Sequence, residues 1–69
     1  MVITADSFCR LPLSEQLDTV LQQGLFLTLR YEDTYAVTHY LLHGFFADLY
    51  YSQQAPWPER IQVLNDQLW

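Results

Sequence analysis

The sequence has no lysine, a single cysteine and only two glycines, and each scarcity excludes a class of function. Three arginines against eight acidic residues give a net charge of -5, which leaves too few cations for the phosphate contacts of nucleic-acid binding. The same balance disfavours an anionic membrane surface, and no apolar run is long enough to cross a bilayer. We therefore expect no nucleic-acid partner and no membrane partner.

The single cysteine, Cys9, bears on the cellular compartment. One cysteine cannot form a disulfide within the chain, whereas small secreted domains usually depend on such bonds. The first ten residues have no cationic start and no long apolar segment, so they do not read as a signal peptide. We therefore expect a cytoplasmic protein.

Catalytic and cofactor motifs are also missing. Gly24 and Gly44 are the only glycines, which nearly excludes a loop that cradles phosphate, and no zinc or nucleotide motif is present. His39 and His43 are four residues apart, which suits a metal pair on a helix but not on a strand that ends in a turn. We expect a protein that is not an enzyme and that has no cofactor and no metal site.

Apolar residues are plentiful by contrast. Of the 69 residues, 51% are hydrophobic and 16% are aromatic, which is too apolar for a disordered chain. A chain of this length builds one small core, so we expect a single domain over residues 1–69. The aromatic excess must pack in that core, against a partner or around a ligand.

A helix is predicted over about residues 14–23. Leucine and valine recur at helical spacing there, Ser14 is the expected N-cap, and Gly24 the expected positive-φ residue at the C-terminal end. A short helical turn is expected over 4–10, with Phe8 and Leu11 as its apolar anchors.

Strands are predicted after the helix, because the sequence becomes rich in aromatic and β-branched residues with alternating pattern. Their expected ranges are about 25–31, 35–42, 45–52 and 59–65. The predicted class is thus α+β, with the helix packed on one face of an antiparallel sheet of three or four strands. A single helix over 34–51 is the rival interpretation, weakened by a cost of about 1 kcal/mol for Gly44 in its middle.

The turn at His43-Gly44 sets the register of the predicted hairpin. A two-residue type I′ turn places Leu42 opposite Phe45, and His39 opposite Asp48 on the other face. An even-length link to the first strand would send Leu25, Leu27 and Leu29 inward under the helix, because a slip of one residue reverses every side chain. Thr28, His39 and Asp48 then form a polar row across the outer face.

The outer face is the predicted interaction surface. Its large groups are too apolar to leave in water, and a contiguous apolar patch usually marks an interface. The expected result is a small acidic protein–protein interaction module that forms a homodimer. The predicted interface residues are Phe26, Arg30, Leu41, Phe46 and Tyr50.

Two other functions stay open. The first is an acidic inhibitor or decoy of phage or mobile-element type that binds a basic protein partner, favoured by charge but weakened by its dispersion along the chain. The second is a small-molecule binder or enzyme that uses the polar row. A cross-strand histidine–aspartate pair more often stabilises a sheet than catalyses, so we rank this function last.

The segment GLFLTLRYEDTYAVTHYLLHGFFADLYYS carries a resemblance. It is similar to small bacterial proteins of about 70 residues and unassigned function, in which a helix precedes a hairpin with the pattern Tyr-x-Leu-x-Gly-Phe-Phe. The resemblance covers roughly 12–64 and implies a helix-plus-sheet fold without catalytic residues; His43 stands where an aspartate is expected. The matching positions are Gly24, Arg30, Tyr40, Leu42, Gly44, Phe45, Phe46 and Asp48.

Overall fold

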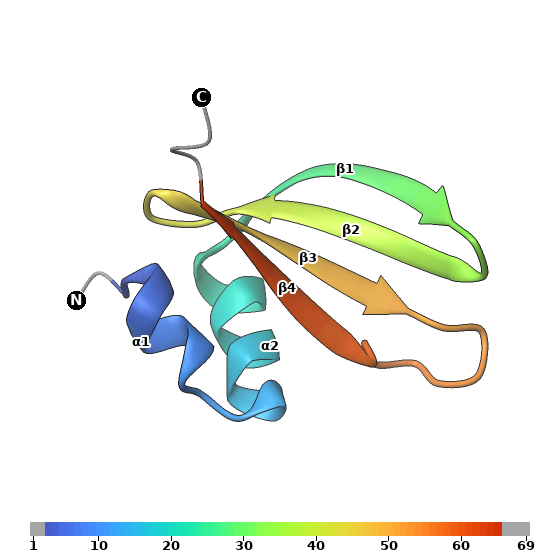
Figure 1. The fold of residues 1–69 in the computed structure, drawn as a ribbon, viewed down its shortest axis with the longest axis horizontal. Helices are drawn as coiled ribbons and strands as arrows, with labels where there is room; N and C mark the ends of the chain where they lie inside the picture. The colour runs from blue at the N-terminus through green and yellow to red at the C-terminus, as the bar shows by residue number, and fades with distance from the viewer. Residues whose placement is uncertain (1–2, 66–69) are drawn as a thin grey trace.

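Two helices precede four strands along the chain in a computed structural model that describes residues 3–65. The strands form one antiparallel sheet in the order β1-β2-β3-β4, with each strand beside its neighbour in sequence (Figure 1). This arrangement confirms the predicted α+β class, and the rival helix over 34–51 is wrong. The elements are α1 (Ala5–Cys9), α2 (Leu13–Gln23), β1 (Leu25–Glu32), β2 (Tyr35–Leu41), β3 (Phe45–Tyr51) and β4 (Arg60–Asn65).

The ends of the helices differ in detail from the sequence prediction. In α1, the Thr4 hydroxyl caps the helix by accepting a hydrogen bond from the Ser7 N–H at 3.1 Å. In α2, the N-cap position is Pro12 rather than Ser14. Gly24 ends α2 in extended backbone with φ of -85°, so the expected positive φ is wrong. A glycine is needed there for space, because a Cβ atom would lie 2.6 Å from the Val20 carbonyl oxygen.

The hairpin of β2 and β3 has the predicted register. Leu42 donates its N–H to the Phe45 carbonyl at 2.8 Å, and His39 lies opposite Asp48. Gly44 takes φ of +83°, as a tight turn requires. The turn is nevertheless not type I′, because Asp33 is the only non-glycine residue with positive φ among residues 3–65, and both central residues of a type I′ turn need it.

The core lies between the helices and the β3–β4 half of the sheet. Figure 1 shows α1 and α2 beside β4, whereas the β1–β2 hairpin extends away from them. Both helices contact β4, and each contributes one fully buried side chain to the core. The buried apolar cluster consists of Phe8, Val20, Leu42, Phe45, Ala47 and Leu49.

Strand β1 corrects the prediction that three leucines point inward. Leu25 lies opposite Leu41 on the outer face, and a bulge at Leu27 then shifts the register before Thr28. Leu29 is on the helix side but is 47% exposed, and the other two leucines are similarly open. The prediction fails because a helix about 10 Å wide covers roughly two strands spaced about 4.8 Å apart, and the two helices lie over β3 and β4.

The helices are short. Neither helix within residues 3–65 is long and apolar enough to cross a membrane.

Candidate functional site

The predicted polar row forms on the face of the sheet opposite the helices. Thr28 of β1 lies opposite His39 of β2, which lies opposite Asp48 of β3. Gln62 of β4 lies opposite Asp48 and extends the row across the whole sheet. These pairs follow from regular antiparallel pairing, in which directly opposite residues share a face.

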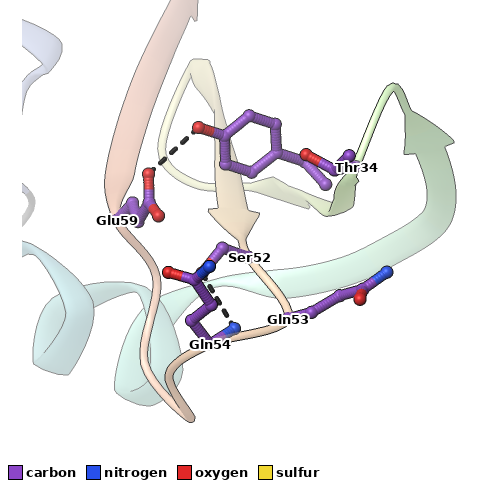
Figure 2. A pocket seen from close by; sticks show the side chains of 6 residues that line it. Thr34, Ser52, Gln53, Gln54 and Glu59 are labelled. Carbon is purple, nitrogen blue, oxygen red and sulfur yellow. Dashed lines mark hydrogen bonds between the residues drawn. The ribbon is translucent and has the colours of Figure 1, made fainter.

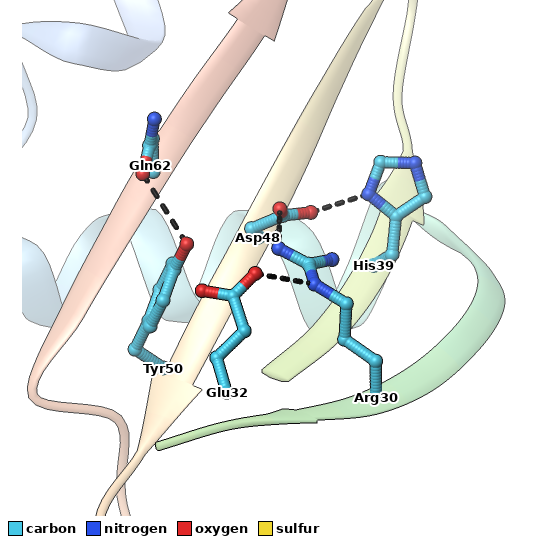
Figure 3. A network of polar contacts seen from close by, with 6 residues as sticks. All are labelled: Arg30, Glu32, His39, Asp48, Tyr50 and Gln62. Carbon is cyan, nitrogen blue, oxygen red and sulfur yellow. Dashed lines mark hydrogen bonds and ion pairs between the residues drawn. The ribbon is translucent and has the colours of Figure 1, made fainter. Parts of the chain in front are cut away.

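Asp48 is the centre of an ionic network (Figure 3). Its side chain is 3% exposed, and it accepts a hydrogen bond from Arg30 Nη2 at 2.9 Å and another from His39 Nδ1. Arg30 Nε donates to Glu32 Oε2 at 2.7 Å as well. Two hydrogen bonds raise the pKa of Arg30 above its usual range: the one to Asp48 has the larger effect and the one to Glu32 the smaller. The guanidinium therefore stays charged and partners the buried carboxylate, which would otherwise be costly to bury.

The network joins strands rather than lining a cleft. Arg30 comes from the edge strand β1 and Asp48 from β3, so their bond reaches across β2. A buried carboxylate that holds a histidine can orient it as a catalytic base. Here the His39 ring also stacks on the Phe46 ring, with 4.9 Å between centroids, so it is packed against the sheet. The arrangement is suited to fixing β1 in place.

The outer face is largely covered by its own side chains. Tyr50 is only 5% exposed because the Arg60 guanidinium lies over its ring at 3.9 Å and Tyr35 packs against its edge. Val37 is fully buried on the same face without any helix above it. This face therefore offers less apolar surface than the sequence pattern indicated.

The five predicted interface residues do not form one exposed surface. Leu41 and Phe46 are half-buried, and Arg30 is engaged by the carboxylates described above. Phe26 is 52% exposed but lies on the helix side, because it pairs with Tyr40 and its ring meets the Tyr40 ring edge-on at 5.6 Å. The assignment of Phe26 to the outer face is thus wrong, and the bulge that follows it is the reason.

A different apolar surface is open to solvent, along β1. Five large apolar side chains of this strand are 42–77% exposed, on both sides of the sheet. The sequence pattern does not reveal this surface, because the alternation along the strand predicts that its leucines lie in the core. A usable signal was the number of strands, since four strands are too many for the predicted helix to cover. We call this set the β1 surface: Leu25, Phe26, Leu27, Leu29 and Tyr31.

Two cavities lie away from both features. The larger, of about 240 Å³, is polar and sits where the β1–β2 turn approaches the β3–β4 loop (Figure 2). Its groups partner one another: the Tyr35 hydroxyl donates to Glu59 at 3.0 Å, which raises the Tyr35 pKa, and the Gln54 N–H donates to Ser52. The second, about 160 Å³, is apolar and lies between Leu13, Leu17 and Trp57. Neither cavity contains a member of the polar row. The exposed β1 surface is therefore the candidate site.

Residues 3–65 contain no group of three or more histidine, cysteine, aspartate or glutamate side chains arranged to hold a metal ion. No protein-family model, curated protein or solved structure matches the chain. The resemblance to small bacterial proteins therefore stays a prediction.

Proposed function

We propose that the chain is a small protein–protein interaction module that self-associates through the β1 surface. The observation that carries this proposal is the exposure of five large apolar side chains on one strand at the edge of the sheet. Together they expose roughly 500 Å², which is in the upper part of the about 300–600 Å² that the largest apolar patch of a typical monomer reaches. The exposed thiol of Cys9 supports a reducing compartment, and we propose the cytoplasm.

The charge on β1 favours a copy of the same chain over a strongly basic partner. The strand carries one cation, Arg30, and one anion, Glu32, and these two bind each other. Two copies therefore meet with little repulsion at this strand, although each chain carries a net charge of -5. The acidic-decoy function needs a concentrated negative surface, whereas the central carboxylate, Asp48, is buried and paired.

The test compares two leucines of equal exposure. Leu27 on β1 is 42% exposed and Leu13 at the start of α2 is 40% exposed. We expect Leu27→Glu to raise the dissociation constant of the dimer about 100-fold or more, because a charge would enter an apolar contact on both copies. Leu13→Glu is the matched control and should associate like the unsubstituted chain.

Sedimentation velocity from low to high micromolar concentration measures this difference. A monomer mass for the unsubstituted chain at every concentration would contradict the proposal. Equal loss of association in both variants would place the contact elsewhere on the molecule. Association that weakens steeply with added salt would also contradict the proposed apolar contact, because attraction between opposite charges would then hold the two copies together.

A further inference from the structure

The ladder between β1 and β2 determines which backbone groups of β1 are unpaired. Leu42 donates to the Phe45 carbonyl, so this pair is of the hydrogen-bonded type. Hydrogen-bonded and non-hydrogen-bonded pairs alternate along an antiparallel ladder. Thr38 is four residues before Leu42, so it also directs its N–H and C=O toward β3. Its neighbours Val37 and His39 direct theirs toward β1. On β1 the same alternation turns Arg30 toward β2 and leaves the N–H and C=O of Leu29 and Tyr31 directed to the free edge.

This free edge has few of the features that prevent strands from pairing. Natural edges are commonly blunted by lysine, proline or inward charges. Strand β1 has no lysine and no proline, and its bulge at Leu27 lies toward one end. Its one cation, Arg30, is bound by Asp48 on the outer face and is drawn over the sheet, away from the edge. Leu29 and Tyr31 therefore combine unpaired backbone groups with exposed apolar side chains.

We propose that β1 pairs antiparallel with β1 of a second copy, with Leu29 opposite Leu29 on a two-fold axis. This inference rests on the proposed self-association and names its geometry. The two sheets become one continuous sheet of eight strands, four from each copy. The β1 surface then lies beside its own counterpart on each face of the sheet, as a two-fold interface requires.

Other registers are less favourable. For the new ladder to form, a residue whose N–H and C=O point to the free edge must lie opposite another such residue. An axis at Arg30 meets this condition but places two guanidinium groups directly opposite each other. An axis at Tyr31 reaches the β1–β2 turn after only one residue beyond Tyr31. An axis at Leu29 pairs Leu27 with Tyr31 and Arg30 with Thr28, which joins apolar to apolar groups and leaves the charges apart.

The amount of surface fits a second copy of this size. A standard interface buries about 800 Å² on each partner. The exposed side chains of β1 can provide at most roughly 500 Å² of this, and the strand backbone and flanking groups must supply the rest. The new backbone hydrogen bonds fix the register.

The experiment measures disulfide formation in a Cys9→Ser background, because the exposed native thiol would otherwise cross-link. In the proposed dimer the two Leu29 Cα atoms are about 5.5 Å apart, within the range of a disulfide. The two Tyr31 Cα atoms are offset by four residues and are about 14 Å apart. We expect Leu29→Cys to form covalent dimers under mild oxidation at least 10-fold faster than Tyr31→Cys, as measured on non-reducing gels.

A mixture of Leu27→Cys and Tyr31→Cys chains is the second probe, in case Leu29→Cys weakens association. This mixture should cross-link as a heterodimer, whereas each variant alone should not. Faster cross-linking of Tyr31→Cys would overturn the register. Failure of all these cysteines to cross-link, while sedimentation still shows a dimer, would overturn edge pairing but leave the proposed function standing. Absence of any dimer would overturn both.

Discussion

Asp48→Asn is expected to lower the free energy of unfolding by about 3 kcal/mol, as for other buried ion pairs that lose one partner. The carboxylate is almost fully buried and accepts hydrogen bonds from both Arg30 and His39. An asparagine keeps the shape but removes the charge that the guanidinium faces. Urea unfolding followed by circular dichroism measures the loss.

Glu32→Gln is the matched control for that substitution. Glu32 binds the same guanidinium, but its side chain is 46% exposed. An exposed ion pair contributes about 0.2–1 kcal/mol, so we expect a loss of at most this size. Equal losses in the two variants would show that the burial of Asp48 does not give the network its strength.

Phe8→Ala is expected to lower the free energy of unfolding by about 3–5 kcal/mol. The Phe8 ring is fully buried, and its centroid lies 5.4 Å from that of Phe45. Phe8 is also the buried residue through which α1 joins the core, so its loss leaves a cavity and frees the helix. A domain of this size has only about 5–10 kcal/mol to lose, so the variant should melt at a much lower temperature.

Trp57→Ala is the control for the loss of an aromatic ring. Trp57 is larger but is 61% exposed at the edge of the small apolar cavity. We expect a change within about 1 kcal/mol, because most of this ring is already in water. A loss for Trp57→Ala as large as that for Phe8→Ala would contradict the account, because it would show that burial of the ring does not determine its contribution to stability.

The register of the central hairpin could be predicted from the sequence because two local signals agree. Gly44 marks a turn, and the alternation on either side permits one pairing that keeps Leu42, Phe45 and Leu49 on a common face. The cross-strand position of His39 beside Asp48 follows directly. Such features depend on neighbours in sequence, where turn chemistry and alternation fix the answer.

The placement of β1 could not be predicted in the same way. Its leucines have the alternation of a half-buried strand, yet what covers them depends on where the helices lie on the sheet. The bulge at Leu27 also escapes a pattern of period two, because an extra residue reverses the faces on one side of it. These two features moved Phe26 to the helix side and left three leucines exposed.

The burial of Asp48 was missed for a related reason. The predicted register correctly places Asp48 on the face that no helix covers, but the absence of a helix does not leave that face open. Long side chains from neighbouring strands, above all Arg30, instead close over it. Such lateral cover depends on the conformations of long side chains, which alternation alone does not specify.

Amide hydrogen exchange of β1 at two protein concentrations tests the central claim, that the free edge of this strand binds a second copy, most directly. The N–H of Arg30 faces β2 and should be protected at both concentrations. The N–H groups of Leu29 and Tyr31 should exchange rapidly in the dilute monomer and become at least 10-fold slower at high concentration. Rapid exchange of both groups at a concentration where sedimentation shows a dimer would contradict edge pairing.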